Sequence, residues 1–189
     1  MNSDPANPNI LATRIRDGKT PGSRRVPIDC GHFDMRIGRD GTWYYRGSAI
    51  QRKPLVTLFS SVLKRDASGQ FWLETPVERG RIDVDDAPFV AVALDISGSG
   101  ESQTLTFHTN LDETVTAGRD HPIRVEMDAD TGEPSPYIHV RDGLDALIVR
   151  SVYYQLANLA VSWQDDDVLG VWSSRVFFEL GRGFDDDDS

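Results

Sequence analysis

The sequence contains one cysteine, Cys30, among its 189 residues. A single cysteine cannot form a disulfide within the chain or supply a multi-thiolate zinc site. No apolar run reaches the roughly 20 residues that span a bilayer. Residues 1–10 hold Asp4 and two prolines where a cleaved secretion signal needs a basic and then an apolar segment. We therefore expect a cytoplasmic protein with no membrane partner.

Basic charge is also scarce, because 20 Lys and Arg residues stand against 30 Asp and Glu residues and give a formal net charge of −10. Four of the acidic residues form the run Asp185–Asp188, which is typical of a solvated tail. The rest of the chain is still acidic and is expected to repel a polyphosphate backbone. We therefore do not expect nucleic acid as a partner.

The hydrophobic residues, 39 % of the chain, are enough for one medium core or two small lobes. Residues 1–30 show no sustained apolar period, and we interpret them as an extended basic arm. Residues 31–86 predict a first α+β lobe and residues 87–184 a second one, followed by the acidic tail at 185–189. The predicted fold class is therefore α+β, with antiparallel strands and one main helix in each lobe.

Alternating apolar and polar residues, bounded by turn residues, predict strands along most of the two lobes. The first two are joined by an Asp40-Gly41 turn, which is typical of a hairpin. The predicted strands cover residues 33–37, 42–46, 70–75, 81–84, 89–94, 104–108, 121–127, 137–140, 168–172 and 176–180.

Two segments carry apolar residues at helical spacing. The first predicts a helix from Pro54 to about Lys64, and the second predicts a longer helix capped by Asp142. The apolar stripe of the second helix would consist of Leu144, Leu147, Ile148, Val152, Leu156 and Leu159.

An offset of 89 residues places Arg52 on Arg141 and aligns the apolar residues of the two predicted helices. This match indicates either an internal duplication or a coincidence between two amphipathic helices. In the first case the chain consists of two related lobes, and their interface is the natural place for a ligand crevice.

Several residues before the first predicted helix suit an anion. Arg46, Arg52 and Lys53 precede the helix N-terminus, where free backbone N–H groups favour a phosphate or carboxylate. The alternative is that these cations are solvated or pair with Asp85 and Asp86.

No set of residues predicts a metal, a cofactor or a catalytic centre. The acidic residues at 83, 85 and 86 match no complete calcium loop, and the run at 165–167 is typical of a solvated turn. The four histidines show no close ligand spacing, and the chain has no G-x-S-x-G nucleophile motif. Cys30 lies two residues before His32, but an inert thiol is the simpler interpretation.

A series of motifs between Cys30 and Gly181 resembles the bacterial domain-of-unknown-function family 1285. The motifs occur in the same order as in that family. They are Asp34-Met35-Arg36-Ile37, Gly41-Thr42-Trp43-Tyr44-Tyr45, Leu58-Phe59-Ser60-Ser61-Val62-Leu63, Val84-Asp85-Asp86-Ala87-Pro88-Phe89, Thr109-Asn110, His121-Pro122-Ile123-Arg124 and Tyr137-Ile138-His139-Val140-Arg141.

The resemblance implies a duplicated α+β fold whose second lobe is similar to pleckstrin-homology-like folds. It also implies a pocket between the lobes for a nucleotide-like ligand, and a role in signalling. The residues that the resemblance places near that pocket are Trp43, Arg52, Asp85, Asp86, Asn110, His121, Arg124 and Arg141.

We therefore expect a protein that binds a small anionic, nucleotide-like ligand. One alternative is a hydrolase that uses His121 with Asp85 or Asp86, which requires these groups to lie within hydrogen-bond reach or to share a water. The other alternative is a protein-interaction module with no small ligand, which a large exposed apolar patch would favour.

Overall fold

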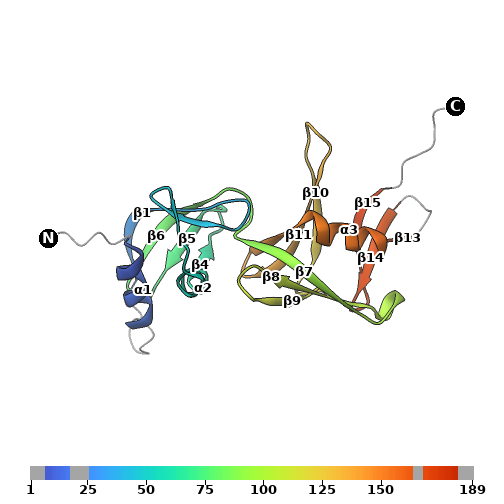
Figure 1. Ribbon diagram of the computed structural model, residues 1–189, viewed down its shortest axis with the longest axis horizontal. Coiled ribbons are helices and arrows are strands. Elements are labelled where there is room, and N and C mark those ends of the chain that lie inside the picture. The colour runs from blue at the N-terminus through green and yellow to red at the C-terminus, as the bar shows by residue number, and fades with distance from the viewer. Residues whose placement is uncertain (1–6, 18–25, 164–167, 183–189) are drawn as a thin grey trace. The chain divides into compact units, whose positions relative to one another are not determined.

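The computed structural model describes residues 7–17, 26–163 and 168–182. The chain forms two compact units, each described below by itself (Figure 1). Unit 1 comprises Met1–Pro88 with Asp142–Leu144, and unit 2 comprises Phe89–Arg141 with Asp145–Ser189. The acidic runs at 165–167 and 185–188 lie outside the described residues.

Unit 1 is built on one six-stranded sheet, with the strand order β3-β2-β1-β6-β5-β4. Its two central strands, β1 and β6, run parallel, and the pairs β1–β2, β2–β3, β4–β5 and β5–β6 are antiparallel. The strands are β1 (Ile28–Ile37), β2 (Trp43–Tyr45), β3 (Ser48–Ala49), β4 (Leu63–Arg65), β5 (Phe71–Glu74) and β6 (Glu78–Val84).

The core of unit 1 lies on one side of this sheet. Phe33, Met35 and Ile37 alternate along β1 with exposed residues and are at most 1 % exposed, as the period of two in a half-buried strand requires. Helix α2 (Lys53–Ser60) adds Phe59, whose ring centroid lies 6.1 Å from that of the buried Trp43.

The expected extended arm is wrong for residues 8–17, which form helix α1 (Pro8–Asp17). Leu11, Ala12 and Ile15 are buried, and α1 packs against α2. Three apolar residues on one face were too few to predict a helix, but burial against unit 1 supplies the stability that so short a helix lacks alone.

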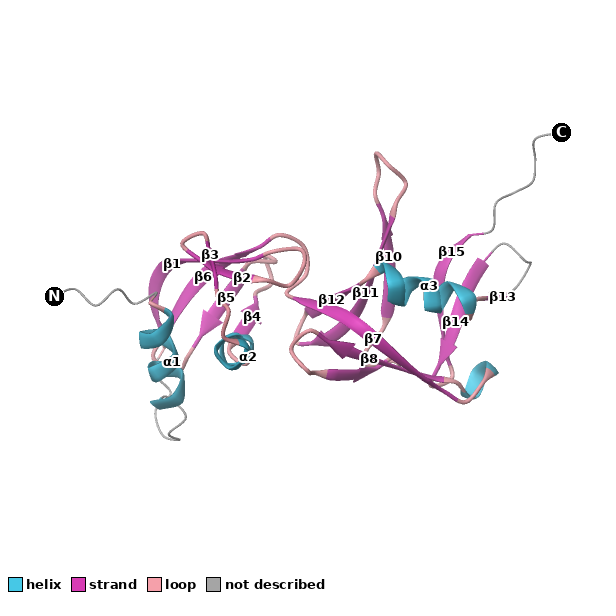
Figure 2. Cartoon of the chain, in the orientation of Figure 1, coloured by secondary structure: helices cyan, strands magenta, loops and turns pink. Residues whose placement is uncertain are grey.

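Unit 2 contains a second six-stranded sheet, drawn with the first in Figure 2. Its order is β10-β11-β12-β7-β8-β9, and β7 and β12 are parallel. When the strands of each unit are numbered along the chain from 1 to 6, the sheet of unit 1 has the order 3-2-1-6-5-4. The sheet of unit 2 has the same order when it is read from β9 to β10. The strands are β7 (Phe89–Ser97), β8 (Thr104–Thr109), β9 (Thr114–Thr116), β10 (Ile123–Met127), β11 (Pro134–Arg141) and β12 (Leu144–Ile148).

The long second helix predicted after Asp142 is wrong in its first half. Leu144–Ile148 is strand β12, and helix α3 covers only Arg150–Asn158. The 89-residue alignment therefore matches a helix with a strand. The repeat between the units lies in the order of the strands and not in the two helices.

A small third sheet completes unit 2, with the order β13-β14-β15. The rings of Trp163, Trp172 and Phe177 pack together with centroids 4.8 to 5.4 Å apart. These strands are β13 (Val161–Trp163), β14 (Val168–Ser173) and β15 (Val176–Arg182), and a one-turn 3-10 helix, η1, covers Gly100–Ser102.

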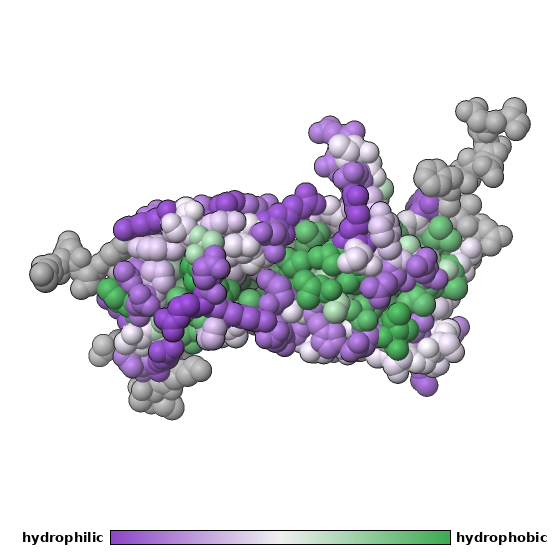
Figure 3. All heavy atoms as spheres, in the orientation of Figure 1, coloured by the Kyte–Doolittle hydropathy of each residue, from purple (hydrophilic) through white to green (hydrophobic). Residues whose placement is uncertain are grey.

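The α+β class and the two-lobe organisation predicted from the sequence are confirmed. Helices long and apolar enough to cross a membrane are absent from the described residues. Apolar side chains reach the surface over unit 2 (Figure 3), and Val92, Ile96 and Leu169 are 47 %, 44 % and 37 % exposed.

Candidate functional site

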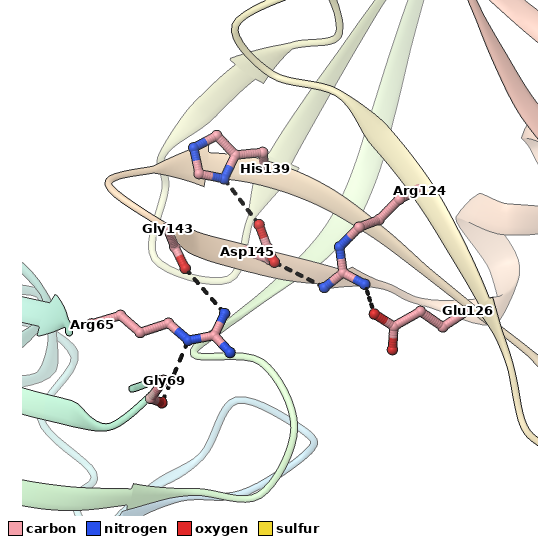
Figure 4. A network of polar contacts seen from close by, with 7 residues as sticks. All are labelled: Arg65, Gly69, Arg124, Glu126, His139, Gly143 and Asp145. Carbon is pink, nitrogen blue, oxygen red and sulfur yellow. Dashed lines mark hydrogen bonds and ion pairs between the residues drawn. The ribbon is translucent and has the colours of Figure 1, made fainter. Parts of the chain in front are cut away.

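The β10–β12 cluster of unit 2 brings together chemically versatile side chains from strands β10, β11 and β12 and from the segment just before β10. We define it by five residues: His121, Arg124, Tyr137, His139 and Asp145. Figure 4 shows Arg124, His139 and Asp145 together with Glu126, which contacts Arg124.

Strand register brings this cluster together. Ile123 faces Ile138 and both are buried, so the next pair, Arg124 and Tyr137, lies on the opposite side of the sheet. His139 follows Tyr137 by two residues and shares its side. Asp145 occupies the corresponding side of β12, between the buried Leu144 and Ala146.

Arg124 is held from three directions. One of its terminal nitrogens donates a hydrogen bond to Asp145 Oδ2 at 2.9 Å, and the other donates to Glu126 Oε1. The guanidinium carbon lies 4.2 Å from the ring centroid of Tyr137, a distance typical of a cation–π contact. Partial burial opposes the charged form, but the hydrogen bond and charge of Asp145 prevail and raise the pKa of Arg124 above its ordinary value.

Both imidazoles of the cluster use Nδ1 in a hydrogen bond. Nδ1 of His139 lies 3.0 Å from Asp145 Oδ1, and Nδ1 of His121 lies 3.1 Å from the backbone oxygen of His139. Since a carbonyl or carboxylate oxygen only accepts, Nδ1 is the donor in each ring. In the neutral rings Nε2 then carries the lone pair, and the two ring centroids are 6.3 Å apart.

The charges of the cluster nearly cancel. With neutral imidazoles, one guanidinium stands against the carboxylates of Asp145 and Glu126, which leaves about one negative charge. A group of three or more His, Cys, Asp and Glu side chains able to hold a metal ion is absent from the described residues. The cluster can therefore accept a proton, donate from Arg124, or offer nitrogen lone pairs.

Comparison with known proteins identifies the chain. Residues 20–87 match the model of the DUF1285 N-terminal domain, a domain of unknown function, and residues 88–180 match the model of the DUF1285 C-terminal domain. The chain belongs to the DUF1285 family. Helix α1 precedes the residues that these models match.

Two solved structures of DUF1285 family proteins resemble this one. The protein from Silicibacter pomeroyi DSS-3 is 46 % identical, with a TM-score of 0.83, and the match covers 93 % of this chain and 95 % of that one. The protein from Shewanella baltica OS155 is 26 % identical, with a TM-score of 0.51, over 66 % of this chain and 90 % of that one. No curated protein matches the chain.

Three of the site residues predicted in unit 1 take part in its framework. Trp43 is 1 % exposed and belongs to the core. Asp85 pairs with Arg36, and Asp86 accepts from Arg39 Nε at 3.1 Å. These carboxylates follow β6 directly, so they tie its end to β1 and to the loop that follows β1.

Arg52, the fourth residue predicted in unit 1, lies at the N-cap position of α2. Its side chain is exposed, and its backbone oxygen accepts from the N–H groups of Leu55 and Val56. This is the position from which the sequence predicts contact with an anion, and that role stays a prediction.

Asn110 and Arg141 of unit 2 lie outside the β10–β12 cluster. Asn110 exchanges two hydrogen bonds with the backbone of Val90, at 3.0 Å through its side chain and 2.8 Å through its own N–H. Arg141 donates from two nitrogens to Glu113, each at 3.2 Å. Of the four site residues predicted in unit 2, the structure brings only His121 and Arg124 into one cluster.

Sequence reasoning left out the residues that complete the cluster, Tyr137, His139 and Asp145. The alternation along 137–140 already placed Tyr137 and His139 on one side of a strand. Asp145 could not be found in this way, because it was assigned to a helix.

Proposed function

We propose that this DUF1285 protein binds a small anionic ligand at the β10–β12 cluster, with Arg124 as the anchor. The observation that supports this proposal is that the two terminal nitrogens of Arg124 have partners of very different exposure. Asp145, whose side chain is 15 % exposed, fixes one edge, whereas the partner on the other edge, Glu126, is 64 % exposed.

Glu126 is the group that a ligand replaces. An ion pair between exposed side chains is worth only about 0.2–1 kcal/mol, so a phosphate or carboxylate can take the place of Glu126 at little cost. The guanidinium remains correctly oriented during the exchange, because Asp145 and the ring of Tyr137 still hold it. A preorganised arginine of this kind loses little entropy when it binds an anion.

The imidazoles select among anions. Neutral His121 and His139 each offer an Nε2 lone pair, which accepts a hydrogen bond from an O–H or N–H group. Monohydrogen phosphate combines oxygens for Arg124 with an O–H for an imidazole. A nucleotide-like ligand and a signalling role, which the family resemblance implied, remain part of this proposal.

The test is a calorimetric titration of the full chain with inorganic phosphate in a buffer that contains EDTA. We expect saturable binding that Arg124→Gln abolishes. Glu126→Gln should instead bind about 1.5- to 5-fold more tightly, because the competing carboxylate is gone. The matched control is Arg150→Gln, which breaks an exposed pair with Glu133 elsewhere in unit 2 and should leave binding unchanged.

The result for Glu126→Gln is decisive because this exposed substitution does not endanger the fold. Equal or weaker binding than in the native chain would show that Glu126 does not compete with the ligand. Repeating the titration with adenosine monophosphate shows whether a ring adds affinity to the phosphate.

A further inference from the structure

We propose that the open edge of strand β7 binds an extended segment of a partner protein, which adds to the sheet of unit 2 as a further strand. We define the open edge as residues 92–97, the part of β7 that lies beyond its last pairing with β12. The guest segment carries apolar side chains at alternate positions and basic side chains between them. This inference goes beyond the proposed anion site, because the open edge contains none of the residues that define the β10–β12 cluster.

The edge is open because one neighbour of β7 is short. On one side β8 pairs with β7 as far as Ser97. On the other side β12 pairs only as far as Ala91, where the N–H of Val149 donates to the backbone oxygen of Ala91 at 3.1 Å. The chain then enters helix α3 at Arg150. In the described part of the chain, residues 92–97 therefore have no strand beside them on this edge, and the backbone groups that point there can pair with a guest strand.

The side chains of β7 show that the core stops short of the open edge. Ile96 faces Leu105 across the β7–β8 pair, so both lie on the core side of the sheet. Leu105 is fully buried, whereas Ile96 is 44 % and Val92 is 47 % exposed, although helix α3 packs against β7. A strand beside β7 would place its own apolar side chains against Val92 and Ile96 and cover them.

The chain protects a comparable edge in unit 1. Among the described residues, 28–34 of β1 lack a strand on the β2 side, because β2 is short and pairs only with the end of β1. There Asp29 Oδ1 accepts from the N–H of Gly31 at 2.9 Å, and His32 Nδ1 accepts from the N–H of Asp34 at 3.0 Å. Side chains thus occupy backbone donors of this segment, and two register shifts disturb its regular spacing, which discourages a guest strand.

The open edge of β7 lacks such protection. Its sequence, Val-Ala-Leu-Asp-Ile-Ser, contains neither proline nor lysine. Its register shift lies between Ala91 and Ala93, so the rest of the edge is regular. Its charged residue, Asp95, lies on the face away from the core and accepts from His108 Nε2 at 2.7 Å. An open edge with alternate exposed apolar side chains is the arrangement to which proteins add an extended peptide.

Charge decides which segment fits the edge. Asp95 is the only charged residue among 92–97, and its side chain is 75 % exposed. A guest residue directly beside Asp95 lies on the same face, where a lysine or arginine forms a favourable cross-strand pair. The net charge of −10 favours the same choice. The guest strand is therefore apolar towards the core and basic towards solvent.

The experiment is a fluorescence anisotropy titration of a labelled, end-blocked heptapeptide, Val-Lys-Val-Lys-Val-Lys-Val, with the full chain. We expect saturable binding of one peptide to each chain. Ile96→Lys should weaken this binding at least about tenfold, because a charge replaces an apolar contact. The matched control is Val161→Lys, which makes the same change of charge at a side chain of similar exposure, 46 %, on β13. This control should leave binding unchanged.

A second peptide tests the role of Asp95. The native chain should prefer the lysine peptide to Val-Glu-Val-Glu-Val-Glu-Val. Asp95→Lys should reduce that preference at least about twofold, since it replaces an attractive cross-strand pair by a repulsive one. Val161→Lys, with the same type of charge introduced elsewhere, should not. An equal effect of both substitutions would overturn the choice of a basic guest.

Hydrogen–deuterium exchange locates the bound peptide. Binding should slow amide exchange within residues 92–97 and leave residues 28–34 of β1 unchanged. The proposal is overturned if Ile96→Lys binds as tightly as the native chain, if protection appears at 28–34 instead, or if no saturable binding occurs up to about 1 mM. It is also overturned if the free chain sediments as a dimer that Ile96→Lys dissociates, because a second copy then covers the edge.

Discussion

Leu11→Ala tests whether α1 is a structural part of unit 1. The side chain of Leu11 is fully buried, although the helix lies outside the residues matched by the family models. Replacing a buried leucine by alanine costs about 2.7–5 kcal/mol, which combines the lost transfer free energy with the cavity left behind. Arg14, on the same helix, donates to Glu78 at 2.6 Å and holds α1 near β6.

The size of the expected effect follows from the size of the unit. Leu11 packs at the edge of the core, where α1 meets α2, so we take the lower end of the range, about 3 kcal/mol. In a domain of this size each kcal/mol lowers the melting temperature by about 4–8 °C. Leu11→Ala should therefore lower the melting temperature of unit 1 by at least about 12 °C, as measured by differential scanning calorimetry.

The matched control is Thr13→Ala, an exposed position on the same helix. This substitution should change the melting temperature by no more than about 4 °C, since surface changes are usually within about 0.5 kcal/mol. A shift for Leu11→Ala as small as that of Thr13→Ala would refute the assignment of α1 to the core.

Two further predictions concern stability. A Cβ atom on Gly80 would clash with the ring of Phe33, so Gly80→Ala should destabilise unit 1 by about 1–3 kcal/mol in urea unfolding. Gly181→Ala, whose Cβ atom would meet open space, should not. Hydrogen bonds, first that of the Ser68 hydroxyl, lower the pKa of Asp66 to about 2. Its contribution to stability is therefore complete above the unfolded value of about 3.9 and is lost as the pH falls towards 2. Asp66→Asn should flatten the decline of the urea midpoint between pH 5 and pH 2.5, and an unchanged slope would contradict this.

Local turn chemistry made the first hairpin predictable. The Asp40-Gly41 pair places a residue with positive φ where the chain reverses, and Ile37 then faces Trp43 across the hairpin. The same signal was available at Asp142-Gly143, where both residues have positive φ, at 48° and 75°. There it was outweighed by apolar residues that fit a helical period as well as a strand.

Residues 144–148 explain why the spacing of apolar residues wrongly predicted a helix after Asp142. Leu144, Ala146 and Ile148 are buried at alternate positions, which is the pattern of a strand, and Leu147 between them is half-buried. Four apolar residues in five satisfy both periods, so sequence alone does not separate them. The neighbouring parallel strand β7 decides the outcome by pairing with β12.

The candidate site was predictable only in part, because its residues come together only when strands that are apart in the sequence pair in the sheet. His121 and Arg124 were found from the family motif, and the outward direction of Arg124 follows from alternation. The contact between His139 and Asp145 depends on β11 and β12 being neighbours, which no local pattern shows. The family resemblance placed Trp43 near a ligand pocket, and only burial shows that it belongs to the core.

The parallel pair at the centre of each sheet joins segments that are far apart in the sequence. β1 pairs with β6, so Ile37 meets Val84, and β7 pairs with β12, so Phe89 meets Ala146. The flanking hairpins close short loops and can form early, whereas each central pair closes a long loop at a greater entropic cost. We therefore expect the middle of each sheet to form last. On the ribosome, β1 must wait with one edge unpaired until residue 84 has emerged, and the nascent chain is most exposed to wrong strand partners during that interval.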